Sequence, residues 1–318
     1  MFFRNLIFSY LIIWKMHRVR RKNAFKKNVI DSEIIRNVHS LEKGMSLPQP
    51  RMEFGKTKIS NLFNLLAIYE KQHWDCAESA EPKMAISVLV SYLSFHKERN
   101  YESEYLDYLN RRVNDYVSKN NFTLDNFVFG GTRVLNSISF SKSDIMIFEK
   151  IIKSRHSIRD FSDEPVDESV LLKAIELANC CPSACNRQTT RVYLIDKNRI
   201  KSLEKWLSGI GGFAETVPYW LIITGVTSAF NDGEVFQHIV NAGISVGYLV
   251  SALTAYGLSS CVVQRPLVYS RTWNNFSKDH NISRDEQVVC FVAVGKSKEQ
   301  TRVPISYRFD SNHFFRKI

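Results

Sequence analysis

The chain has 318 residues, of which 44% are hydrophobic and 24% charged, and its net charge is +11. This length predicts about two domains, and the ordinary glycine and proline content excludes a collagen-like or globally disordered chain. No apolar run reaches the roughly 18–20 residues of a membrane-spanning helix, which excludes a polytopic membrane protein.

The excess positive charge is concentrated at the N-terminus. Residues 1–30 hold eight basic side chains and no acidic one, and residues 1–60 account for +9 of the net charge. A nucleic-acid channel would need basic residues across the fold, so we expect no nucleic-acid partner. The apolar stretch 6–14 is too short to span a bilayer, and its charges follow it, which does not fit a cleaved signal peptide. It is either an interfacial anchor at the inner face of a membrane or a first helix packed on the protein's own core.

The six cysteines do not predict a disulfide scaffold in a chain of this length. Cys180, Cys181 and Cys185 form a cluster, but no second Cys/His pair stands at the spacing of a zinc site. We therefore expect no metal site and a reducing, cytoplasmic location.

The first half of the chain predicts helices. Apolar residues recur at helical spacing in two stretches between residues 60 and 118. Loop-forming residues follow, including Gly130-Gly131 and a serine-rich run at 137–143. We expect an N-terminal arm (1–30), a mainly helical extension (31–145) and a second domain (146–318).

The second half alternates helices and strands. We expect a helix that starts at 165–168 and runs through Ala178, with Asp167 or a neighbour as its N-cap, and a long apolar helix over 234–256 that ends at Gly257. A further helix is expected over 198–207. The predicted strands are 191–196, 219–224, 260–263 and 287–294. This order predicts an α/β or α+β fold with helices that cover a sheet.

Four segments carry polar residues that suit a bound cofactor. In 154–161, Arg155 and Arg159 would share one face if the segment were helical, and arginine forks bind phosphate well. In 181–188, Ser, Asn and Gln side chains could read the polar edge of a heterocycle. The other two segments are 257–266, a helix end that runs into a strand, and 304–308 near the C-terminus. Taken singly, each also fits an ordinary surface or turn.

Together and in this order, the segments SRHSIRDFSDEPVD, CPSACNRQ, AYGLSSC, VAVGKS and PISYR resemble the nitroreductase family of FMN-dependent oxidoreductases. The resemblance covers residues 148–310. It implies an α+β flavin fold with a central mixed sheet flanked by helices, and a homodimer with FMN at two interface sites.

The resemblance also implies roles for individual residues. Arg155, His156, Ser157 and Arg159 lie in the motif that holds the FMN phosphate and ribityl chain, and Arg308 matches a late basic residue that reaches the phosphate. Pro182, Ser183, Asn186 and Gln188 lie in the loop beside the isoalloxazine ring, which often comes from the other subunit. Val263, Gln264 and Arg265 occupy the segment whose backbone approaches flavin N5.

The sequence departs from the family pattern on the substrate side. Thr189-Thr190 stand where Pro-Trp is frequent, Ser259 replaces a glycine, and Arg265 is larger than usual. The activity implied is hydride transfer from NAD(P)H through FMN to a small-molecule acceptor, with no side-chain nucleophile. Two alternatives are a flavoenzyme acting on a sugar-linked metabolite in surface-polysaccharide biosynthesis, and a non-catalytic scaffold with a degenerate flavin site.

The extension resembles one found on a subset of nitroreductase-like proteins, through the segment HSLEKGMSLPQPRMEFGK. Its residues His39, Glu42, Lys43 and Arg51 could form a polar lid over the flavin. The alternative is a structural loop that caps the helical extension.

Overall fold

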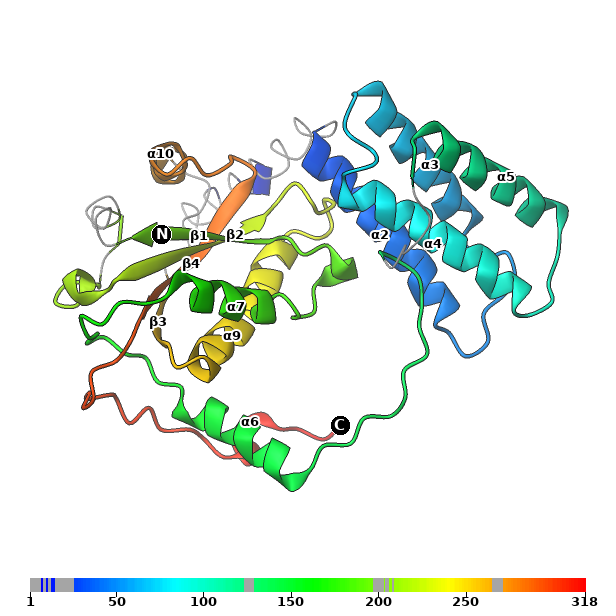
Figure 1. The fold of residues 1–318 in the computed structure, drawn as a ribbon. Coiled ribbons are helices and arrows are strands. Elements are labelled where there is room, and N and C mark those ends of the chain that lie inside the picture. Colours follow the sequence, from blue (N-terminus) through cyan, green and yellow to red (C-terminus); the bar gives the residue numbers. More distant parts are fainter. Residues whose placement is uncertain are drawn as a thin grey trace.

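The structure is a computed structural model. It describes residues 26–122, 129–196, 209–264 and 271–318, and seven single positions between residues 7 and 207. Most of the predicted N-terminal arm and of the predicted helix 198–207 lies outside the described residues, and membrane contact through that arm stays a prediction. The described chain forms a helical part and a sheet part, joined by an extended segment (Figure 1).

The helical part has its own core, made of buried side chains between Ile30 and Phe122. The helices predicted between residues 60 and 118 are confirmed, because their apolar residues recur every three or four positions and turn toward one another. Tyr69, Tyr92 and Leu66 are among the largest side chains with no exposed surface. The helices are α2 (Lys27–Met45), α3 (Lys56–Lys71), α4 (Ala80–Lys97) and α5 (Glu104–Lys119).

The sheet part confirms the predicted α+β class and the four predicted strands. Its sheet has the order β1-β2-β4-β3, and all three strand pairs are antiparallel. The expectation of a mixed sheet is therefore wrong for the described strands, and the parallel component is confined to an isolated bridge between Ser157 and Ser260. The strands are β1 (Thr190–Asp196), β2 (Tyr219–Val226), β3 (Ser259–Val263) and β4 (Glu286–Gly295).

Both faces of this sheet are covered, which explains why its central strands read as continuous apolar runs. In β2, Trp220 and Ile222 pack into one core, whereas Leu221 and Ile223 pack into another. The second core is closed by α7 (Glu168–Ala178) and α9 (Gln237–Ala255). The helix predicted to follow Pro165 is confirmed, and Asp167 caps it by accepting a 2.8 Å hydrogen bond from the Ser169 N–H.

The helix α9 is the long apolar helix that the sequence predicts. It has the length and mean hydropathy (1.3) of a membrane-crossing helix, but core helices of soluble proteins also have these properties. Its N-terminal turn lies close to β2, because a Cβ on Gly225 would stand 2.7 Å from the His238 carbonyl oxygen. A glycine is therefore needed at this crossing.

An extended segment connects the two parts. It is anchored in the helical part by Gly131, whose N–H donates to Glu42 Oε1 at 3.1 Å, and it leads into α6 (Lys142–Ser154). Ser141 and Asp144 form a capping box at the start of α6. No residue of α6 is buried. The division of the chain at residues 30 and 145 stays a prediction.

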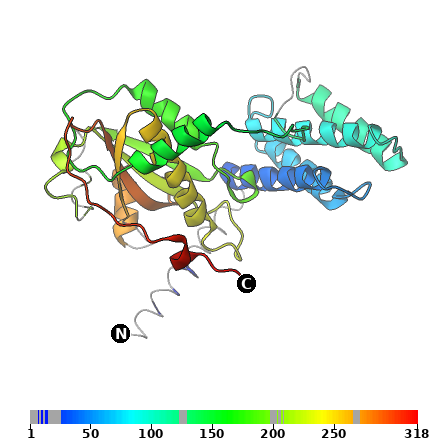
Figure 2. The ribbon, with the colours of Figure 1, turned by 90° about the horizontal axis from the view of Figure 1, so that it is seen from below.

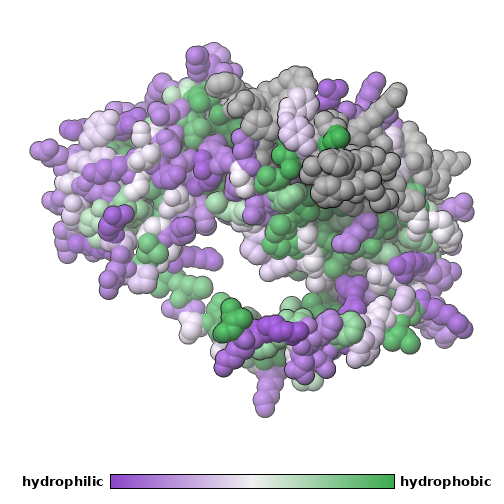
Figure 3. Space-filling model, turned by 180° about the vertical axis from the view of Figure 1, so that it is seen from behind, coloured by the Kyte–Doolittle hydropathy of each residue, from purple (hydrophilic) through white to green (hydrophobic). Residues whose placement is uncertain are grey.

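The C-terminal residues after β4 run back along the molecule to the short helix α11 (Ser311–Phe314). Seen from below, the C-terminus lies away from the helical part (Figure 2). Figure 3 shows an opening through the molecule. It separates the rest of the molecule from the lower edge, where Figure 1 places the connecting segment and α6. Many exposed apolar side chains occur in the connecting segment, α6 and the C-terminal residues, among them Val134, Leu135, Phe140, Met146, Phe148, Ile305, Tyr307 and Phe309.

Candidate functional site

The motif at residues 155–161 begins where α6 ends. Arg155 is the C-cap of α6 and has an extended backbone, so the conditional expectation of a helical face shared by Arg155 and Arg159 does not apply. The chain instead runs along β3, and the Ile158 N–H donates to the Ser260 carbonyl oxygen at 3.0 Å. Both arginines nevertheless lie near the Cys261 thiol. Burial raises the pKa of this thiol, and the charges of Arg159 and Arg155 oppose that rise.

A cavity of about 340 Å³ opens beside this motif. This volume lies within the range of small-molecule sites. None of the described residues that line it is acidic, so the cavity carries a positive potential suited to an anion. Its polar lining residues are Lys153, Arg155, His156, Ser157, Ser306 and Arg308.

The cavity thus brings together four of the predicted site residues, although Arg308 is more than 150 positions from the others. Arg308 Nη1 donates to the Ser306 carbonyl oxygen at 3.0 Å, and His156 Nδ1 lies 2.9 Å from the Ser154 carbonyl oxygen. These contacts leave further guanidinium donors free to bind an oxyanion. Arg159 is exposed and does not line the cavity.

The second predicted group lies in the loop Pro182–Gln188, which contains the single helical turn η1 (Ala184–Asn186). Three non-glycine residues, Cys185, Asn186 and Gln188, have positive φ angles of 53°, 53° and 47°. Such a backbone persists only where surrounding contacts hold it. Ser183 supplies one contact, because its Oγ accepts from the Gln188 N–H at 3.1 Å. Pro182, Asn186 and Gln188 are exposed, and Ser183 is half-buried.

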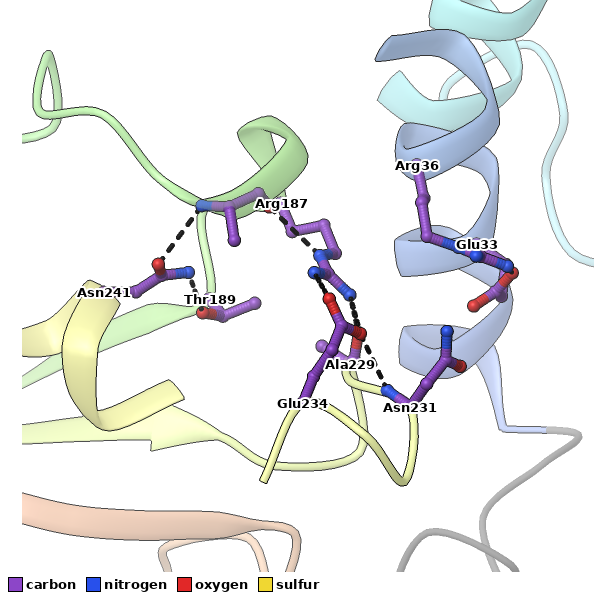
Figure 4. A network of polar contacts seen from close by, with 9 residues as sticks. Glu33, Arg36, Arg187, Thr189, Ala229, Asn231, Glu234 and Asn241 are labelled. Atoms are coloured by element: carbon purple, nitrogen blue, oxygen red, sulfur yellow. Dashed lines mark hydrogen bonds and ion pairs between the residues drawn. The ribbon is translucent and has the colours of Figure 1, made fainter. Parts of the chain in front are cut away.

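Arg187 holds this loop from inside, and its role was not predicted from the sequence. Its side chain is 1% exposed, its Nε donates to the Ala184 carbonyl oxygen at 3.0 Å, and its two terminal nitrogens pair with both carboxylate oxygens of Glu234 (Figure 4). The guanidinium also stacks over the Phe230 ring at 4.2 Å. No local signal could have revealed the pair, because its partners are 47 positions apart.

The Arg187 pairing changes the acid–base behaviour of Glu234. Hydrogen bonds from Arg187 are the largest cause that lowers the pKa of Glu234, and Arg36 of α2 contributes a further favourable charge. Asn241 of α9 braces the same loop: its Oδ1 accepts from the Ala184 N–H at 3.1 Å, and its Nδ2 donates to Thr189 Oγ1 at 3.2 Å. Thr189, a departure from the family pattern, therefore has a structural role.

The third predicted group lies at the end of β3. Val263 pairs with Phe291 of β4 and is half-buried, and Gln264 is exposed. Arg265 lies outside the described residues.

The cavity and the loop lie toward opposite ends of the sheet. The loop leads into Thr190, which pairs with Gly225 and through it with Gln287 at the start of β4. The cavity motif instead bridges to Ser260, which pairs with Val294 near the end of β4. Seven residues of strand separate these positions, about 24 Å at the rise of an antiparallel strand. Within one chain, the two predicted halves are therefore not brought together.

The residues proposed as a lid do not line the cavity. Glu42 instead binds Gly131 of the connecting segment, and its other oxygen lies 3.8 Å from His39. Lys43 and Arg51 are exposed on the helical part. Among the described residues, no group of His, Cys, Asp and Glu side chains could hold a metal ion, and the six thiols are free.

Comparison with known proteins gives a family match over residues 152–211, to the nitroreductase family. No curated protein matches the chain. Among solved structures, it resembles a nitroreductase family protein from Streptococcus pneumoniae (20% identity, TM-score 0.45, covering 54% of this chain and 100% of that one). A putative nitroreductase from Bacillus subtilis (21%, 0.47, 55% and 100%) and an FMN-dependent nitroreductase from Clostridium difficile (22%, 0.44, 53% and 98%) are similar to the same extent.

Replacing Glu234 by glutamine should destabilise the protein in a pH-dependent way. The change leaves the buried Arg187 guanidinium opposite a neutral amide, which should lower the free energy of unfolding by about 1–3 kcal/mol at neutral pH. The folded pKa of Glu234 lies below its unfolded value of about 4.3, so its stabilisation is present above that pH and is lost as the pH falls through the lowered pKa.

Urea unfolding of the wild type and of Glu234→Gln, at neutral and at acidic pH, measures this difference. The exposed Glu299→Gln is the matched control and should change little. A loss for Glu234→Gln that equals the control, or that does not shrink toward acidic pH, would contradict the role given to the pair.

Proposed function

We propose that this chain, whose residues 152–211 belong to the nitroreductase family, is a flavin-dependent oxidoreductase that binds FMN. The observation that carries the proposal is the cavity in which Arg155, Ser157 and Arg308 meet without an acidic neighbour among its described lining residues. Arginine forks and a serine hydroxyl are the donors that a phosphate monoester needs. The residues present therefore fit the phosphate end of FMN.

The ring of the flavin would lie toward a second copy of the chain. The loop Pro182–Gln188, which carries the amide and hydroxyl groups suited to a polar heterocycle, is about 24 Å along β4 from the cavity of its own chain. A second copy that presents its loop to this cavity would complete the site. We therefore propose a homodimer with two sites, each shared between copies.

Exposed apolar surface supports this arrangement. One side of α9 leaves Phe236, Val240, Ile244 and Tyr248 exposed, and α6 and the C-terminal residues add more. α6 and α9 contact each other, and large groups of exposed apolar side chains on neighbouring elements usually mark an interface. Covering it with a second copy would bury α6 and α9 and close the cavity to water.

When bound, FMN supplies the hydride chemistry, and we propose NAD(P)H as the electron donor and a small molecule as the acceptor. The chain's own residues bind and orient the cofactor. Arg155, His156, Ser157 and Arg308 hold the phosphate end, and the end of β3 at Val263 with the following Gln264 provides backbone groups beside the ring. The loop of the second copy excludes water from its far side.

Replacement of the cavity arginines tests the cofactor assignment. Arg155→Ala with Arg308→Ala should abolish FMN retention, because each charge-assisted hydrogen bond contributes roughly 1.5–3 kcal/mol. Arg159→Ala is the control within the same motif, and it should cost less because Arg159 does not line the cavity. Flavin content after gel filtration measures both. Full retention by the double variant would overturn the phosphate assignment.

The visible spectrum of the purified protein, before and after anaerobic NADH or NADPH, tests the activity. A flavin spectrum that bleaches with one nicotinamide supports the oxidoreductase and identifies its donor. A flavin that neither nicotinamide reduces would contradict the proposed donor. A colourless protein that cannot be reconstituted with FMN would contradict the proposed function.

A further inference from the structure

The helix α2 of the extension lies between the helical part and the sheet part, and most of its residues are buried or half-buried. Of its nineteen residues, only Lys43 is exposed. One face, with Ile30, Ile34 and Val38, closes the core of the helical part. Residues outside this face lie against the sheet part, where α2 contacts the turn η1 of the loop Pro182–Gln188. The extension is therefore packed directly onto a predicted cofactor loop.

A polar contact and a longer-range charge interaction accompany this packing. Asn28 Nδ2 donates to Ser228 Oγ at 3.2 Å and to the carboxylate of Asp285, which is itself buried at the start of β4. The Ser228 hydroxyl also donates to Asp285 at 2.6 Å. Asn28 thus joins the extension to a buried carboxylate of the sheet part.

The second interaction acts through charge at longer range. Arg36 and Glu33 form an ion pair on α2, and the turn that carries Asn231 and Glu234 lies beside this helix (Figure 4). The charge of Arg36 favours the ionised form of Glu234, which pairs with the buried Arg187.

These contacts explain how the loop Pro182–Gln188 keeps its unfavourable backbone conformation. Its three non-glycine residues with positive φ would relax if their surroundings were loosened. Arg187 and Asn241 support the loop from the sheet side, and α2 contacts its turn η1 from the extension. The helix α2, the turn at residues 228–234 and the loop form one packed unit.

We propose that α2 is a positioning element for the flavin site, and that the extension of each copy acts on the site of the other copy. The inference rests on the proposed function, in which the loop serves the cavity of a second chain. Because α2 packs on the loop of its own chain, it stands beside the site that this loop completes. The extension is then a part of the partner's cofactor site.

Replacing Asn28 by aspartate tests the positioning role. The new carboxylate faces Asp285 and should repel it, which loosens α2 without touching the cavity. We expect FMN to dissociate about tenfold faster, equivalent to roughly 1.4 kcal/mol. Asn110→Asp, at an exposed position of α5, is the matched control and should leave the rate unchanged.

Exchanging the amide of Asn28 and the carboxylate of Asp285 distinguishes a loss of positioning from a general destabilisation of the fold. Asn28→Asp with Asp285→Asn restores an amide opposite a carboxylate, and it should recover most of the slow dissociation. Arg36→Ala, a milder change on the same helix, removes the charge that acts on Glu234 and covers the case in which Asn28→Asp fails to fold. Wild-type dissociation rates for both Asn28→Asp and Arg36→Ala would overturn the positioning role.

Mixed dimers test which copy the extension serves. One chain carries Arg155→Ala with Arg308→Ala, and the other carries Asn28→Asp, with different tags for purification. Only the second chain has a working cavity, so one FMN per two chains is expected. If the extension acts across the dimer, that FMN faces an intact α2 and dissociates at the wild-type rate. Dissociation at the fast Asn28→Asp rate would show that each extension serves its own chain.

The two proposals fail in different ways. A wild-type protein that cannot be loaded with FMN contradicts the proposed function before any variant is compared. A wild-type protein that loads normally, with fast dissociation from the mixed dimer, contradicts only the inference about the extension.

Discussion

The pairing of Arg187 with Glu234 is the interaction on which the predicted flavin loop depends. It places a guanidinium with 1% exposure beneath a loop whose backbone is unfavourable at three positions. A buried cation is tolerated only with enough acceptors, and Glu234 and the carbonyl oxygens of Ala184 and Ala229 supply them. The charge of Arg36 on α2 adds a smaller favourable effect on Glu234, and the extension contacts the turn η1 of the same loop.

The antiparallel sheet sets the second constraint. It carries the basic cavity toward one end of β4 and the loop at the other, and no side chain can bridge about 24 Å within one chain. The apolar faces of α6 and α9 are left exposed in the same chain. The proposed shared site would account for both features, because a second copy would cover the apolar surface and bring its loop to the cavity.

Local patterns predicted most of the fold. The cap at Asp167, the four strands and the apolar helix α9 all follow from residue types within a few positions of one another. That Arg155 and Arg308 belong to one site was predicted only through the resemblance to the nitroreductase family. The antiparallel pairing and the Arg187–Glu234 bond could not be predicted, since both depend on contacts between distant residues. The extended backbone at Arg155 also escaped prediction, because its bridge to β3 overrides local preference.

Sedimentation velocity tests the shared site most directly. The protein would be followed over a dilution series at both its ultraviolet absorbance and the visible band of the flavin. A site shared between copies predicts that flavin sediments only with a species of two chains, and that dilution to single chains releases it. Flavin that sediments with a single chain would contradict this account.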